Sequence, residues 1–169
     1  MNNLLQYGFS FVFLIMFQVL VLNNLHMSIF INPYAYILFI LMLPFATPGW
    51  LTLSLAFLLG LSMDAFSNTM GMHSAAIVFT AFLREYLLKI MAPRDGYESL
   101  QSPHYGFMGM TWFLIYAGIL TFIHHLVLFL LEDFRMEKLF SLIFKSLLST
   151  SLSLIIMTVL LLATYKPRR

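Results

Sequence analysis

The length and number of the apolar runs constrain the fold more than any other feature of the sequence. A helix that crosses the hydrocarbon core of a bilayer needs about 20 predominantly apolar residues. Six runs reach or approach that length, and polar connections separate them. The predicted helices span residues 4–22, 33–45, 50–66, 72–91, 107–131 and 139–165. The sequence therefore predicts an all-α integral membrane protein, a single membrane domain over residues 1–169 built as a six-transmembrane-helix bundle.

The composition agrees with a membrane protein and excludes several other classes. Hydrophobic residues make up 61% of the chain and charged residues 9%, whereas a soluble domain is typically about 25% charged. The absence of cysteine excludes disulfides and thiolate metal sites. A net charge of +2 is too small to indicate nucleic-acid binding. The first apolar run lacks a basic n-region and a cleavage pattern, so we expect it to be retained.

The second and third runs are short, and the turn signal ATPG at residues 46–49 joins them. They are expected to form a tight helical hairpin. If they instead entered and left the membrane on the same side as a re-entrant pair, the orientation of the later helices would be unchanged. Six spans place both termini on one side of the membrane. Basic residues favour the cytoplasmic side, which predicts cytoplasmic termini and a cytoplasmic loop at 92–106. The basic residues on that side are Lys89, Arg94, Lys166, Arg168 and Arg169, against Arg135, Lys138 and Lys145 on the other.

Polar side chains gather at the predicted outer end of the bundle. They are Asp64, Asn68, His73 and the adjacent pair His124 and His125. One interpretation is that they cap helix ends and satisfy free backbone groups. A second is a polar contact surface for another membrane protein. A metal site is the weakest interpretation, because no HxxxH or HxxE spacing occurs and adjacent histidines point to different helix faces.

Arg84 lies well inside a predicted span, where a central arginine costs about 2.5–3.5 kcal/mol. It is expected to face protein or water, or to extend toward the cytoplasmic headgroups. Glu85 and Lys89 have the i,i+4 spacing of a helical ion pair, which favours a self-neutralising half-helix.

The last helix carries small hydroxyl residues at three- and four-residue spacing: Ser146, Ser149, Thr150 and Ser153. Small residues on one face let transmembrane helices approach closely and form hydrogen bonds. This helix-packing face is expected to serve the bundle itself rather than a foreign helix. Elsewhere the sequence has no GxSxG, HExxH or Walker motif and no chain of buried acids. We therefore predict that the protein is not an enzyme and needs no cofactor.

Three stretches resemble a known family. GLSMD (residues 60–64), then Gly71 and His73, then AFLREYLL (residues 81–88), resemble the rod shape-determining protein MreD family. The stretches INPYAYILFILMLPF and APRDGYE are similar to its Bacteroidetes-type branch, and the length and hydropathy profile extend the similarity over nearly the whole chain. Asn68 stands where many family members have a glycine.

The resemblance implies a fold similar to the S-components of energy-coupling-factor transporters. It also implies a non-enzymatic scaffold of the rod complex, or elongasome, in the bacterial inner membrane. The implied partners are MreC, MreB, a SEDS-class glycosyltransferase and a class B penicillin-binding transpeptidase, with a homodimer as a further possibility. Asp64 and Arg84 are the family-like polar positions. The alternative function is a vitamin-binding transporter subunit, which would need a ligand pocket near the level of Asp64, His73 and His124. An intramembrane enzyme is a distant third.

Overall fold

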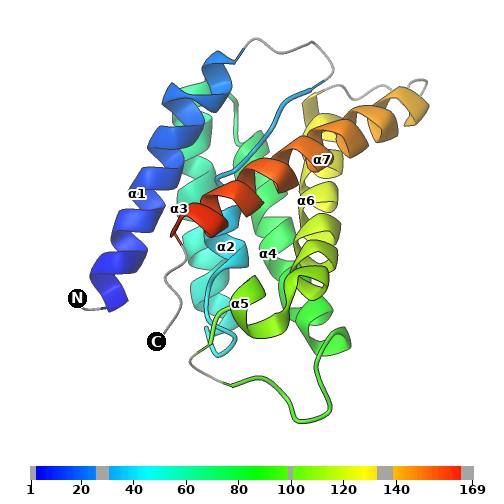
Figure 1. The fold of residues 1–169 in the computed structure, drawn as a ribbon. Coiled ribbons are helices and arrows are strands. Elements are labelled where there is room, and N and C mark those ends of the chain that lie inside the picture. The colour runs from blue at the N-terminus through cyan, green and yellow to red at the C-terminus, as the bar shows by residue number, and fades with distance from the viewer. Residues whose placement is uncertain (1–2, 26–30, 99–100, 133–138, 165–169) are drawn as a thin grey trace.

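The computed structural model describes residues 3–25, 31–98, 101–132 and 139–164, and this part of the chain folds into helices without a β-sheet (Figure 1). The elements are α1 (Asn3–Leu20), the short 3-10 helix η1 (Leu22–Asn24), α2 (Leu38–Leu41), α3 (Gly49–Ser67), α4 (Met72–Ile90), α5 (Tyr105–Met108), α6 (Met110–Glu132) and α7 (Leu139–Thr164). The bounds of α1, α3, α4 and α7 lie within two residues of those predicted from the sequence. The helix predicted for 107–131 is interrupted at Gly109, between α5 and α6, and the second apolar run differs more.

Within the described residues, four helical segments are long and apolar enough to cross a membrane. They are Leu5–Asn24, Gly49–Ser67, Met110–Glu132 and Leu139–Thr164. The prediction of an all-α membrane protein is therefore confirmed, and four of the six predicted spans meet these requirements. The helix α4 is as long as α3, at 19 residues, but it carries Arg84, Glu85 and Lys89, which lower its hydropathy.

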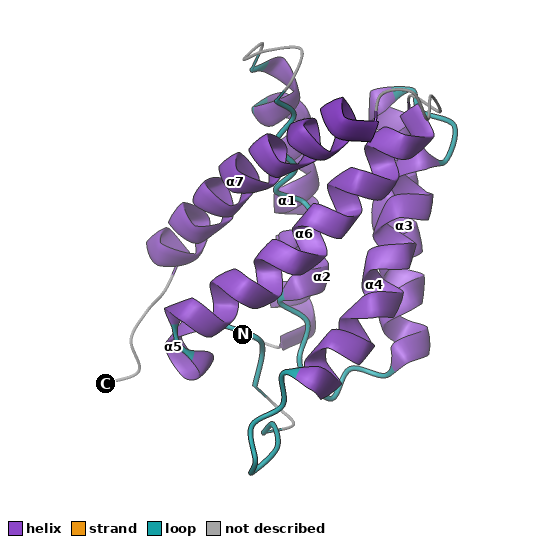
Figure 2. Ribbon diagram, turned by 90° about the vertical axis from the view of Figure 1, so that its right-hand side faces the viewer, coloured by secondary structure: helices purple, strands orange, loops and turns teal. Residues whose placement is uncertain are grey.

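The helices α3, α4 and α6 lie side by side in this order, and α7 packs against α6 at an inclination to it (Figures 1 and 2). We call the end of the bundle at residues 68–71, between α3 and α4, the turn end. The opposite end, which carries residues 91–98 after α4, is the loop end. The basic residues Arg135, Lys138, Lys166, Arg168 and Arg169 lie outside the described residues, so the cytoplasmic location of the termini stays a prediction.

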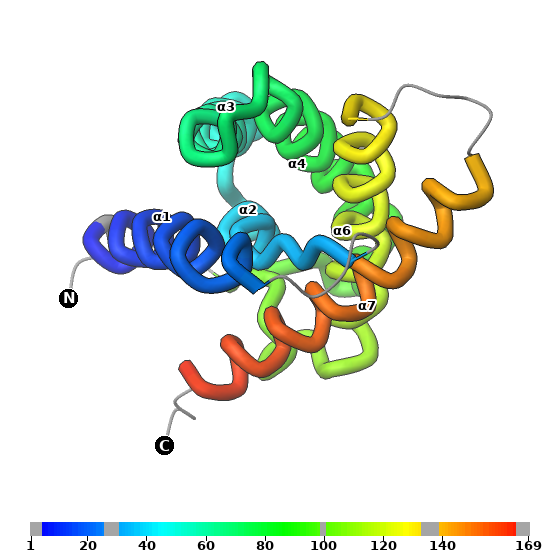
Figure 3. Tube along the Cα trace, turned by 90° about the horizontal axis from the view of Figure 1, so that it is seen from above, coloured from blue at the N-terminus to red at the C-terminus, as the bar shows by residue number. Residues whose placement is uncertain are grey.

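The second apolar run is not the helix predicted for residues 33–45, because only Leu38–Leu41 is α-helical. Residues 32–36 are irregular and run into the centre of the bundle, with the other helices arranged around them (Figure 3). Ala35, Tyr36 and Ile37 have no exposed surface. We call residues 32–44, which include α2, the central segment. Irregular backbone at membrane depth is tolerated only where protein or water satisfies its polar groups, so the central segment depends on its neighbours.

Side chains of α1 and α7 satisfy the backbone at the start of the central segment. Gln18 accepts a hydrogen bond from Ala35 N at 2.8 Å and donates one to Pro33 O at 3.0 Å. Ser149 Oγ accepts from Asn32 N at 3.1 Å, and Ser153 Oγ accepts from Tyr34 N at 2.9 Å. These bonds replace the intrahelical bonds that a regular helix would form, which explains why the apolar pattern alone predicted the wrong conformation.

Candidate functional site

Asp64 caps the first turn of a helix other than its own. The helix α4 begins at Met72, and the residue before it, Gly71, has no side chain that could cap the helix. The Asp64 carboxylate accepts hydrogen bonds from His73 N at 2.9 Å and Ser74 N at 3.0 Å, and from the hydroxyls of Thr69 and Ser74, both at 2.6 Å. A carboxylate at a helix N-terminus satisfies free N–H groups and interacts favourably with the helix dipole. Asp64 is buried, so it offers little surface to a partner.

Gly60 and Asn68 fit the same junction for steric reasons. A Cβ added to Gly60 would overlap the backbone of Ser74, so a glycine is required where α3 and α4 touch. Asn68 ends α3 in the left-handed conformation, with φ of 54°. Glycine adopts this conformation most readily and asparagine is among the few other residues that do so, which accounts for Asn68 at the end of α3. Asn68 is exposed and does not join the buried cluster.

His73 and His124 meet through a tyrosine that sequence analysis did not identify. The hydroxyl of Tyr36 lies 3.0 Å from His73 Nδ1 and 2.7 Å from His124 Nε2. One hydroxyl donates one hydrogen bond, so one imidazole presents a lone pair to it and the other presents an N–H. All three side chains are buried. The His124 Nδ1 atom is sealed from solvent and has no hydrogen-bond partner among the described residues.

His125 points to a different set of groups. Its Nδ1 lies 2.8 Å from the carbonyl of Thr121, and its Nε2 lies 3.1 Å from that of Asn32. It therefore helps to hold the central segment and does not bond to His124. Within the described part of the chain, no three His, Asp or Glu side chains lie close enough to hold a metal ion.

A polar cavity opens beside this cluster at the turn end. Its volume is about 330 Å³. It is lined by Leu22, Asn23, Leu25, Asn32, Pro33, Tyr34, Ser67, Thr69, His73 and Glu132. Glu132 lies 3.5 Å from Lys145 Nζ, so its charge is partly neutralised. The cavity offers amides, hydroxyls and an imidazole to a small polar molecule.

Arg84 is buried against protein rather than extended toward headgroups, so the structure shows the first of the two orientations expected from the sequence. Its exposed fraction is 1%. Its Nε donates to Tyr116 Oη at 3.0 Å, and its Nη2 donates to the carbonyls of Leu43 and Pro44. Tyr116 in turn donates to Leu41 O at 3.1 Å. Arg84 and Tyr116 thus satisfy the carbonyls at the end of the central segment, where a positive charge suits the negative end of a helix.

Glu85 and Lys89 do not form the expected ion pair. Glu85 instead places its carboxylate against Gly49, where a Cβ would overlap Oε1. Gly49 is the first residue of α3, and that helix has no side-chain cap of its own. Lys89 Nζ lies 5.6 Å from the centroid of the Tyr86 ring. The helices α3 and α4 therefore each place a carboxylate at the N-terminus of the other: Asp64 of α3 lies at the start of α4, and Glu85 of α4 lies at the start of α3.

The hydroxyl face predicted on α7 is turned into the bundle, since Ser146, Ser149, Thr150 and Ser153 are all buried. Sequence analysis treated these residues as a packing face and missed that Ser149 and Ser153 bind backbone N–H groups of the central segment. It also gave no role to Gln18, which has no exposed surface. An isolated glutamine within an apolar run was the available signal.

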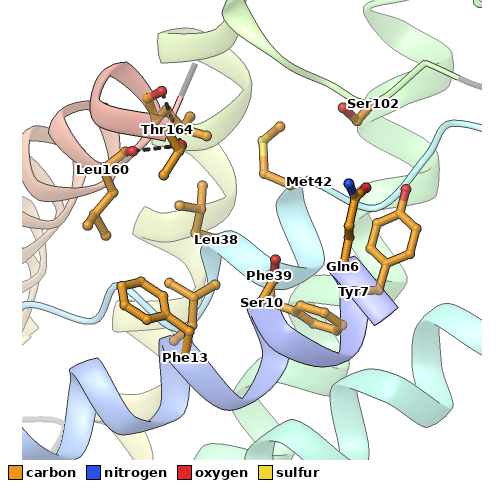
Figure 4. Close-up of a pocket in the computed structure, with 12 residues that line it drawn as sticks. Gln6, Tyr7, Ser10, Phe13, Leu38, Phe39, Met42, Ser102, Leu160 and Thr164 are labelled. Atoms are coloured by element: carbon orange, nitrogen blue, oxygen red, sulfur yellow. Dashed lines mark hydrogen bonds between the residues drawn. The ribbon is translucent and has the colours of Figure 1, made fainter. Parts of the chain in front are cut away.

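A second cavity, of about 290 Å³, lies between α1, α2 and α7 (Figure 4). Polar groups of Gln6, Tyr7, Ser10 and Thr164 and apolar groups such as Phe13 and Leu38 line it together. The helices α1 and α7 also have smaller buried shares than α3 and α6. These two helices are therefore the least buried of the four candidate spans.

No family model, no curated protein and no solved structure matches this chain. The family assignment rests on the resemblance of the residues quoted above.

Proposed function

We propose that this protein is a non-enzymatic membrane scaffold of the MreD type. In this role it binds the transmembrane or juxtamembrane part of MreC in the bacterial inner membrane, with cytoplasmic termini. Through MreC it assembles with MreB, a SEDS-class glycosyltransferase and a class B penicillin-binding transpeptidase to support lateral peptidoglycan synthesis and rod cell shape.

One observation carries the proposal. The residues of the family-like pattern hold helices together: Gly60 permits contact, Asp64 caps α4, and Arg84 supports the central segment. Each buried polar group of this pattern is bonded to backbone or hydroxyls, so none of them resembles a nucleophile beside a base. Residues committed to a rigid bundle suit a protein that presents a surface to others.

The side formed by α1 and α7 is the surface that we assign to MreC. Its exposed apolar residues include Phe9 on α1 and Val159 on α7. The cavity between the two helices leaves room for side chains of an incoming helix (Figure 4). Transmembrane helices associate through close packing and interhelical hydrogen bonds, and Ser10 and Gln6 supply polar groups there.

The test is co-purification with MreC in detergent, comparing wild type with Ser10→Phe. Ser10 lines the cavity, so a phenylalanine would fill it and we expect recovery of MreC to fall at least about tenfold. Ser54→Phe is the matched control, because Ser54 is exposed on α3. Equal recovery of MreC by both variants would remove this surface from consideration. If wild type recovers no MreC, the scaffold proposal itself fails.

The polar cavity at the turn end supports a second candidate, a vitamin-binding subunit of a transporter. Its lining includes His73 and Glu132, at the level where such a pocket was expected. Mass spectrometry of extracts from the purified protein would test this. A small molecule retained by wild type and lost in Thr69→Phe, which fills the cavity, would favour the transporter candidate. A protein free of small molecules that still recovers MreC would favour the scaffold.

A further inference from the structure

Arg84 is a buried cation without a counter-ion in the described part of the chain. Its hydrogen-bond partners are a tyrosine hydroxyl and two carbonyls, all uncharged. The one ion pair within 4.0 Å among the described residues joins Lys145 and Glu132, on other helices. Burial of an ionised group is costly unless an opposite charge accompanies it. No carboxylate of the described residues supplies that charge within 4.0 Å of Arg84, so a bound anion would compensate it.

The geometry around Arg84 shows where that molecule would bind. A cavity of about 370 Å³ at the loop end is lined by Phe45, Ala46, Thr47, Gly49, Arg84, Glu85, Leu88, Lys89, Ala92 and Tyr97. The Nη1 atom of Arg84 has no protein partner among the described residues, and it is not one of the sealed polar atoms. It is thus the part of the guanidinium that is free to bond within the cavity.

The other charges of the cavity leave it net positive. Glu85 places its carboxylate against Gly49 at the N-terminus of α3, where the helix dipole favours a negative charge. Lys89 contributes a second cation, and no carboxylate of the described residues lies within 4.0 Å of it. Arginine and lysine on one cavity are the groups that bind phosphate oxygens in proteins.

We propose that this loop-end cavity binds a phosphate-bearing anion, with Arg84 Nη1 donating to its oxygens and Lys89, which also lines the cavity, turning its ammonium from the Tyr86 ring toward them. The phosphate belongs either to the headgroup of a membrane lipid or to a soluble phosphate ester. Its charge compensates Arg84, so the ligand also stabilises the contact between α4 and the end of the central segment. This inference does not depend on whether the protein is a scaffold.

The experiment is a titration of the delipidated full-length protein, followed by tryptophan fluorescence and thermal unfolding. Trp112 is a suitable reporter because it stacks on Tyr116, with ring centroids 5.0 Å apart, and Tyr116 bonds to Arg84. The probes are dioleoylphosphatidylglycerol, sn-glycerol 3-phosphate and dioleoylglycerol, which has the same acyl chains without phosphate. Binding of the phospholipid alone assigns the site to a lipid headgroup. Binding of both phosphate compounds assigns it to phosphate as such.

Variants make the result specific to the cavity. Arg84→Gln should abolish the response, and Lys89→Gln should weaken binding about tenfold, the expected loss for one charge-assisted hydrogen bond. Arg94→Gln removes the same charge from an exposed loop position and should bind as wild type does. If Arg84→Gln does not fold, Lys89→Gln still provides the test. The proposal is overturned if dioleoylglycerol acts as strongly as the phospholipid, or if Lys89→Gln and Arg94→Gln have equal affinity.

Discussion

At its first turn α4 receives a carboxylate from α3, whereas near its last turn it carries a guanidinium that no described carboxylate approaches. The turn end is closed, since Asp64 accepts four hydrogen bonds from residues of the turn and of α4. The loop end is open, since Arg84 bonds to neutral groups and faces a cavity. The same helix thus has one end completed by the protein and another that a ligand can complete. The polar residues at the turn end stabilise the contact between α3 and α4, whereas those at the loop end both stabilise the fold and suit the binding of a ligand.

Removal of the cap should have the largest effect. Asp64→Ala leaves two N–H groups and two hydroxyls without their acceptor, and we expect a loss of about 3 kcal/mol in the free energy of unfolding. Chemical unfolding in detergent measures it. Asp64→Asn retains an acceptor oxygen and should lose less. A variant Asp64→Ala as stable as wild type would mean that the turn end is not held by this carboxylate.

The second largest loss of stability is expected from a change that pushes α3 and α4 apart. Gly60→Ala forces a methyl group against the backbone of Ser74, and we expect about 2 kcal/mol of destabilisation. Gly8→Ala is the control, because a Cβ there meets nothing within 4 Å. Thermal unfolding of the two variants side by side measures the difference. Similar melting temperatures would show that α3 and α4 are not in close contact at Gly60.

The histidine pair should depend on Tyr36. Tyr36→Phe leaves His73 Nδ1 and His124 Nε2 without their shared partner, at a cost of about 1.5 kcal/mol. Tyr34→Phe is the matched control, since Tyr34 packs against the same histidine rings and its hydroxyl has no hydrogen bond to the described residues. Chemical shifts of the imidazole ¹⁵N nuclei would report the change directly. Unchanged shifts in Tyr36→Phe would contradict the bridge.

At the loop end, a smaller loss is expected from Tyr116→Phe. The hydroxyl that links Arg84 to Leu41 O disappears, which should cost about 1 kcal/mol. Tyr7→Phe, on the exposed face of α1, serves as control. Because Arg84 keeps its carbonyl partners, phosphate binding should persist in Tyr116→Phe. If Tyr116→Phe lost as much unfolding free energy as Asp64→Ala, the protein would hold its loop end as firmly as its turn end, which would contradict the comparison.

The smallest effect concerns pH and the loop before α6. His104 Nδ1 accepts a hydrogen bond from Gly106 N at 3.0 Å, and burial lowers the pKa of His104 below its ordinary value of 6.5. The folded state therefore favours the neutral ring, and its stability falls as the pH drops below 6.5 and through the folded pKa. Amide exchange at Gly106 should show weaker protection in acid. His104→Asn retains an acceptor that does not titrate, so its protection should not share that dependence.

Long apolar runs predicted α1, α3, α4, α6 and α7, because the length needed to cross a bilayer leaves few alternatives. The central segment could not be predicted in this way. Its conformation depends on bonds from Gln18, Ser153 and Arg84, which are distant in sequence.

In the candidate site, too, local features could be predicted from the sequence and contacts between distant residues could not. The proximity of Asp64 to His73 was predicted because both flank one short turn. The bridge through Tyr36 was not, since Tyr36 lay within a run that was interpreted as a regular helix. The two orientations expected for Arg84 could not be separated from the sequence, because hydropathy gives the depth of a residue but not which side of the helix faces protein.

The exchange of carboxylates between α3 and α4 bears on how the chain enters the membrane. A solitary α3 would bring Asp64 into hydrocarbon without its donors, and a solitary α4 would enter with its first N–H groups bare. The transfer of either helix into lipid is more favourable when the other lies beside it, because their polar groups then satisfy each other. We expect the two to leave the insertion machinery together, as a closed pair.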